Sequence, residues 1–78
     1  MKNKIKLGKY QHYKSKFYDV IGLAYDSETL EEKVVYRALY NSKKLGNNPI
    51  FVRPYEEFFE KIFVNNKEIP RFKLIKNK

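Results

Sequence analysis

Hydrophobic and polar residues alternate in short runs along this chain of 78 residues, and polar turns separate the runs. A period of two places successive side chains on opposite faces of a β-strand, and the runs are rich in Val, Ile, Tyr and Phe, which favour strands. Because the connections are short, neighbouring strands are expected to pair antiparallel. The pattern predicts six strands, at residues 8–13, 17–25, 33–40, 50–52, 61–64 and 68–74.

Glycine and proline mark the breaks between these runs. Residues 41–49 are the clearest loop, because they combine Gly, Asn and Pro. Pro54 suits the first position of a helix and two acidic residues follow it, so a short helical turn is predicted over residues 55–60. Gly22 inside the second run indicates a bulge, and Pro70 marks the last run as an edge strand.

These elements predict a mainly β fold. Five to six short antiparallel strands with one helical turn favour a small SH3-like barrel or roll, and an open sheet with a helix packed on it is the alternative. A basic arm at residues 1–7 would precede a single domain at 8–75 and a basic tail at 76–78. Without Cys, the seven Tyr and six Phe must supply much of the core.

Several classes of protein are disfavoured by composition. No apolar run approaches the roughly 18 residues of a membrane-spanning helix, and the basic start lacks the apolar stretch of a signal peptide. With one His and no Cys, a metal site built from these residues cannot form, and no cofactor is expected. We therefore expect a cytoplasmic protein without membrane contact, and the oligomeric state is left open.

The net charge of +8 is concentrated at the two ends of the chain. Residues 1–18 hold six Lys and no acid, and residues 69–78 contribute +4, whereas residues 19–32 hold five acids and no base. A basic excess can indicate a polyanionic partner. However, an AT-rich coding sequence would also enrich Lys, Asn and Ile, so the charge alone identifies no partner.

Five motifs occur together along the chain, and their combination is more specific than any one of them. They are GKYQHYK at 8–14, SET at 27–29, VVYRALY at 34–40, VRP at 52–54 and PRF at 70–72. In this order and spacing they resemble a small bacterial family known as domain of unknown function 1653. The resemblance spans residues 8 to about 75 and implies an SH3-like β-barrel, and it implies no activity.

Three residues depart from the pattern of that family. Ser15 stands where the family often has Gly, Asp26 where it often has His, and Phe51 where it often has Trp. The change at Asp26 matters most, because a role that needs a second imidazole beside the following turn cannot operate in this chain.

Three arginines stand out in a chain with fourteen lysines, because a guanidinium offers planar, multidentate hydrogen bonding. Each could pair with an acid from residues 26–32 or 56–60. Alternatively, Arg37 and Arg53 could bind a phosphate or carboxylate. For Arg71 the ion pair is the preferred interpretation.

Ser27, Glu28 and Thr29 fit a capped turn, in which side-chain oxygens accept backbone N–H groups. The alternative places Glu28 and Thr29 at the rim of a ligand pocket. Tyr36 could belong to an aromatic platform for bases, although a core position is favoured.

His12 could be combined with Ser27 and Asp26 into a nucleophilic triad. No glycine-rich oxyanion turn flanks the serine, so a packed, hydrogen-bonded histidine is favoured and no catalytic residue is expected.

The sequence thus predicts a non-catalytic binding module for an anionic partner, such as nucleic acid, a nucleotide or an acidic peptide. A protein–protein adaptor or regulatory domain with incidental charge is the alternative, and a hydrolase is least favoured. The candidate ligand-binding residues are Arg53, Arg37, Tyr36, Ser27, Glu28, Thr29 and His12.

Overall fold

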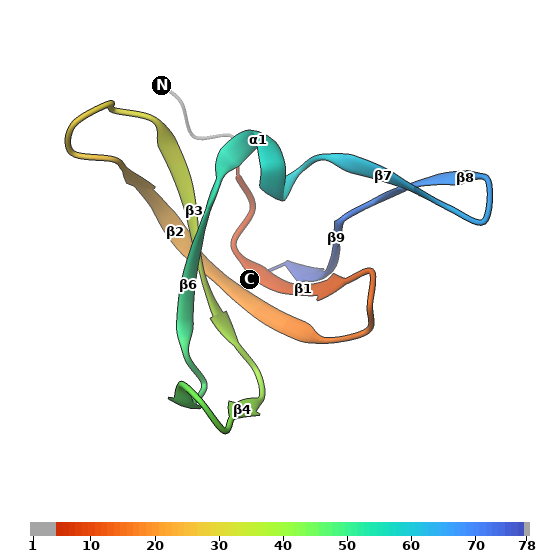
Figure 1. Ribbon diagram of the computed structural model, residues 1–78, viewed down its shortest axis with the longest axis horizontal. Coiled ribbons are helices and arrows are strands. Elements are labelled where there is room, and N and C mark those ends of the chain that lie inside the picture. The colour runs from red at the N-terminus through yellow and green to blue at the C-terminus, as the bar shows by residue number, and fades with distance from the viewer. Residues whose placement is uncertain (1–4, 78) are drawn as a thin grey trace.

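A five-stranded antiparallel sheet forms the body of the protein in the computed structural model, which describes residues 5–77 (Figure 1). The strand order is β6-β3-β2-β1-β9. These strands are β1 (Gly8–His12), β2 (Phe17–Tyr25), β3 (Glu32–Ala38), β6 (Ile50–Pro54) and β9 (Phe72–Asn77).

Two small hairpins and one short helix complete the fold. They are β4 (Asn41–Ser42) with β5 (Gly46–Asn47), β7 (Lys61–Val64) with β8 (Lys67–Pro70), and α1 (Tyr55–Phe58). In Figure 1 the β7–β8 hairpin extends away from the sheet. Its two-residue turn, Asn65-Asn66, has positive φ at both positions, as a tight turn between twisted strands requires.

The mainly β prediction is confirmed, and the strands differ from it in detail. The last predicted strand is broken at Arg71, which separates β8 from β9. The predicted loop at 41–49 contains the short β4–β5 ladder, and β9 continues to Asn77, into the predicted tail. Of the predicted arm, residues 1–4 lie outside the described residues, whereas Ile5 packs against the core.

The sheet is curled but its backbone pairing does not close it into a barrel. Among the described residues, β6 pairs only with β3, and β9 pairs only with β1, so both remain edges. The fold is therefore the predicted small antiparallel β-fold with one short helix, without a closed barrel among the described residues, and side chains from α1 cover part of one face.

The core is an aromatic cluster on the inner face of this sheet. Alternation along β3 buries Val34 and Tyr36, and the helix adds Phe58, whose ring stacks on Phe72 at a centroid distance of 4.1 Å. The predicted irregularity at Gly22 is present, since the β2–β3 register shifts between Val20 and Gly22. None of the helical structure in the described range is long and apolar enough to cross a membrane.

Candidate functional site

The alternation of β3 separates two of the predicted site residues. Tyr36 and Arg37 are neighbours in the strand, so their side chains lie on opposite faces of the sheet. Arg53 pairs in register with Val34 and is therefore on the inner face with Tyr36, whereas Arg37 lies beside Asp19 on the outer face. Arg37 and Arg53, both candidates for an anionic ligand, therefore lie on opposite faces of the sheet and cannot contact the same small ligand.

Arg53 contacts a group of four aromatic side chains on the inner face, and we call these five residues the Arg53 cluster. Its members are His12 from β1, Tyr18 from β2, Tyr36 from β3, Arg53 from β6 and Phe72 from β9. The Phe72 ring is at its centre, with ring centroids 4.8 to 5.6 Å from those of the other three aromatic residues. The Arg53 Cζ atom is 5.8 Å from the same centroid, within cation–π range.

Arg53 is held in place and is still accessible. Its Nε donates a hydrogen bond to the Tyr36 hydroxyl at 3.3 Å, and its side chain is 31% exposed. Glu57, four residues along the chain, is 3.9 Å from one terminal nitrogen and is itself exposed. Exposed ion pairs of this kind contribute little stability. Since a guanidinium has five N–H donors, these two contacts leave donors for a ligand.

His12 lies in the cluster as a neutral imidazole. The backbone N–H of Lys14 donates to its Nδ1 at 3.1 Å, which places the ring proton on Nε2. Burial lowers the pKa of His12 below its ordinary value, and the positive charges of Arg53, Arg71 and Lys14 lower this pKa further. In the described contacts His12 touches neither Ser27 nor Asp26, so the triad that can be written from the sequence is not assembled.

Tyrosine hydroxyls form the polar rim of the cluster. The hydroxyls of Tyr18 and Tyr40 share a hydrogen bond of 2.8 Å, and the Lys16 ammonium lies 4.6 Å from the Tyr40 ring centroid. Burial raises the pKa of Tyr18, and its hydrogen bond to Tyr40 raises this pKa further, so the hydroxyl keeps its proton. Tyr36, in contrast, is only 4% exposed and cannot serve as a stacking platform.

Sequence reasoning missed Tyr18, although this ring contacts four other aromatic side chains of the inner face. Strand alternation could have placed Tyr18 on the inner face, because it is two residues from the apolar residue Val20 in the same strand.

Arg71 has a structural role, as the sequence suggested. Its Nη2 is 3.2 Å from the Glu60 carboxylate, and its backbone N–H donates to the Glu60 carbonyl at 3.0 Å. Its own carbonyl accepts a hydrogen bond from the Tyr13 N–H at 2.9 Å. Arg71 therefore connects the break between β8 and β9 to the segment after α1 and to the end of β1.

The predicted residues of the β2–β3 turn belong to a local capping structure. Asp26 Oδ1 accepts the backbone N–H groups of Glu28 at 2.9 Å and Thr29 at 3.0 Å, and Thr29 Oγ1 accepts that of Glu31. These backbone hydrogen bonds lower the pKa of Asp26. Ser27, Glu28 and Thr29 are exposed and line none of the cavities described below, so the capped turn accounts for them.

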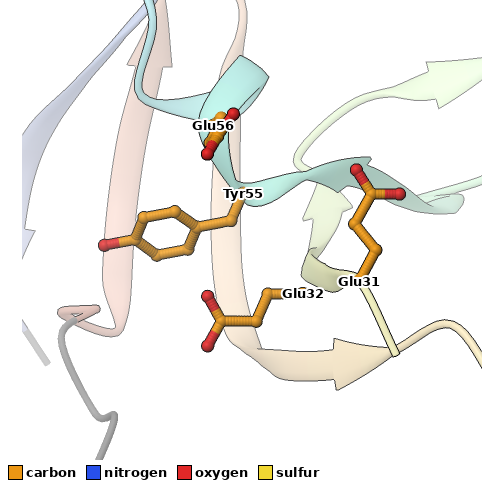
Figure 2. Close-up of a pocket in the computed structure, with 4 residues that line it drawn as sticks. All are labelled: Glu31, Glu32, Tyr55 and Glu56. Atoms are coloured by element: carbon orange, nitrogen blue, oxygen red, sulfur yellow. The ribbon is translucent and has the colours of Figure 1, made fainter. Parts of the chain in front are cut away.

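One cavity is acidic. Its volume is about 290 Å³, and its lining residues are Glu31, Glu32, Tyr55 and Glu56. Figure 2 shows Glu32 and Tyr55 extending to the same side, while Glu31 points the other way. Within residues 5–77 no group of carboxylates and imidazoles is arranged to hold a metal ion. An anionic ligand would be repelled here.

A larger groove lies between β1 and the β8–β9 junction. Its volume is about 420 Å³, and its lining residues are Gln11, His12, Tyr13, Ile69, Pro70 and Lys73. Sequence reasoning did not find this groove, because its two walls are more than 50 residues apart in the chain. His12 belongs both to the groove and to the Arg53 cluster.

Comparison with known proteins places the chain in a family. No curated protein matches it. The chain is similar to a crystal structure of a DUF1653 protein from Bordetella bronchiseptica, with a TM-score of 0.84 and 29% sequence identity. The match covers 100% of this chain and 96% of that protein. The family model for the protein of unknown function DUF1653 matches residues 8–74. The chain therefore belongs to the DUF1653 family.

Proposed function

We propose that this domain is a non-catalytic binding module whose ligand is an anion held at the Arg53 cluster. The observation that carries the proposal is the environment of Arg53. Its guanidinium is oriented by Tyr36 and Phe72, yet it is partly exposed and only loosely paired with Glu57. Such preorganisation reduces the entropy that a long side chain loses on binding.

The surroundings of Arg53 suit a phosphate or a carboxylate. The carboxylate near Arg53 is that of Glu57, which is exposed and distant enough to be displaced, and the His12 Nε2 and tyrosine hydroxyls of the cluster can donate hydrogen bonds. A guanidinium can bind two oxygens of such a group at once, which gives short, charge-assisted hydrogen bonds.

The same groups favour binding over catalysis. A nucleophile is normally activated by an adjacent base or by a lowered pKa. The pKa of Tyr18 is raised, and His12 contacts no hydroxyl nucleophile among its described hydrogen bonds.

One observation favours an adaptor as the second candidate. The edge strand β6 exposes Ile50 and Val52 on the face opposite Arg53. An open edge with apolar side chains can pair with an extended segment of a partner protein. Such apolar binding would respond weakly to salt, whereas binding of a small anion at Arg53 would weaken as salt increases.

Two matched variants test the proposal, Arg53→Gln and Arg37→Gln. Both remove one guanidinium from the second-to-last position of a strand, but from opposite faces of the sheet. Phosphate and pyrophosphate are titrated at low salt, and the amide and arginine Nε–Hε resonances are followed by NMR. Hydrogen bonds to charged groups contribute about 1.5–3 kcal/mol, so Arg53→Gln is expected to weaken binding by at least about tenfold. Arg37→Gln should bind like the wild type.

Equal losses in the two variants would contradict a defined site, because the binding would then follow net charge. Shifts restricted to residues 1–7 and 73–78 would likewise move the binding to the basic ends of the chain. In that case, a long single strand of nucleic acid should bind with a steep dependence on salt.

A further inference from the structure

The groove beside His12 has aromatic and apolar side chains on two sides. Tyr13 forms one wall and is 37% exposed, and its ring lies against the His12 ring at a centroid distance of 4.6 Å. Ile69 and Pro70 of β8 form the other wall. Flat aromatic and apolar surfaces of this kind are what nucleobases stack on in many binding sites.

The charge of the groove complements an anion. Lys73 lines it, the Lys14 ammonium is 5.8 Å from the Tyr13 ring centroid, and none of the six lining residues is acidic. The acidic cavity, in contrast, is lined by Glu31, Glu32 and Glu56, so it and the groove are opposite in charge.

The groove and the Arg53 cluster are adjacent through His12. The His12 ring is part of the groove wall, and it also packs edge-on against Phe72, the ring over which Arg53 lies. A ligand with a planar ring at one end and an anionic group at the other could occupy both regions. The volume of about 420 Å³ lies at the lower end of the usual range for small-molecule sites, which suits a single nucleoside unit.

We infer that the ligand is a free nucleoside monophosphate, with its base in the groove between Tyr13 and Pro70 and its phosphate at Arg53. This inference rests on the proposed function, because it identifies the anion that the Arg53 cluster binds. Tyr13 acts here as a stacking residue, and Lys73 contributes charge at the groove.

Three ligands separate the contributions of base and phosphate: AMP, ribose 5-phosphate and adenosine. We expect AMP to shift the amide resonances of Gln11, Tyr13, Ile69 and Lys73 together with the Arg53 side chain. Stacking of a base on an aromatic ring should make AMP bind at least about tenfold more tightly than ribose 5-phosphate. Tyr13→Ala should abolish this difference and leave ribose 5-phosphate binding unchanged, whereas Tyr13→Phe should retain it.

Tyr25→Ala is the matched control, because Tyr25 is exposed at the opposite end of β2, outside the groove. It should leave AMP binding unchanged. Lys73→Gln provides a second test, and it should weaken AMP without altering the fold, since Lys73 is exposed.

The two proposals fail in different ways. If AMP and ribose 5-phosphate bind equally and both shift Arg53, the groove assignment is overturned and the proposed function stands. If no phosphate compound shifts Arg53, the proposed function is overturned and this inference with it. A single-stranded pentanucleotide that binds more than about tenfold tighter than AMP would overturn the assignment to a free nucleotide.

Discussion

Phe58 connects the short helix to the sheet, and its removal should destabilise the whole domain. The side chain is 0% exposed, stacks on Phe72 at 4.1 Å and makes edge contacts with Tyr10 at 5.5 Å and Tyr36 at 5.3 Å. Replacing a fully buried Phe with Ala typically costs about 3–5 kcal/mol, because apolar burial is lost and a cavity remains. The Phe59 ring, at a centroid distance of 4.9 Å, is a fourth aromatic partner, and these contacts place Phe58→Ala in the upper part of this range.

This cost is large relative to the stability of so small a domain. At roughly 0.05–0.15 kcal/mol per residue, a chain of 78 residues is stable by about 4–12 kcal/mol. The variant should therefore lose from about a third to all of its free energy of unfolding. With a urea dependence of about 1 kcal/mol/M, the midpoint of unfolding should fall by at least 3 M, or no folded baseline should remain.

Phe63→Ala is the matched control, since it makes the same substitution at a side chain that is 76% exposed on the β7–β8 hairpin. Its free energy of unfolding should change by no more than about 0.5 kcal/mol. Urea unfolding followed by far-ultraviolet circular dichroism measures both variants. The assignment of the core would be refuted if Phe58→Ala unfolded at the wild-type midpoint, or if Phe63→Ala lost as much stability.

Two further predictions concern the turn and the histidine. Asp26→Ala should lower the urea midpoint of unfolding, because the N–H groups of Glu28 and Thr29 lose their acceptor. Asp26→Asn keeps an oxygen acceptor and should lower the midpoint less. Equal losses in the two variants would contradict the capping role. The pKa of His12 is lowered from 6.5 in the folded state, so the unfolded chain takes up this proton first as the pH falls. Stability should therefore decrease as the pH falls through 6.5 towards the folded pKa, and His12→Gln should flatten this dependence in urea titrations at several pH values. The lowered pKa of Asp26 affects stability in a different pH range, because the stability that this carboxylate contributes is lost only as the pH falls below 3.8. A His12→Gln profile identical to that of the wild type between pH 7.5 and 5 would refute the assignment.

Part of the candidate site was predictable from the sequence. His12, Tyr36 and Arg53 were all named as candidates, and the structure brings them together around Phe72. The separation of Arg37 from Tyr36 was also predictable, because strand alternation puts adjacent residues on opposite faces. The groove could not be predicted, because its β8 wall is positioned by Arg71, whose contacts reach distant parts of the chain.

The sequence by itself determined the local structure of this protein. The strands, the capped turn that begins at Asp26, the bulge near Gly22 and the Asn65-Asn66 turn all depend on interactions among residues close in the chain, which a sequence pattern records directly. Only the tertiary structure decided that β6 and β9 are edge strands among the described residues, that Arg53 of β6 reaches Phe72 of β9, and that β1 and β8 enclose a groove. These features depend on the curl of the sheet and on contacts between distant segments, and the alternation of residues along each strand does not encode either of them.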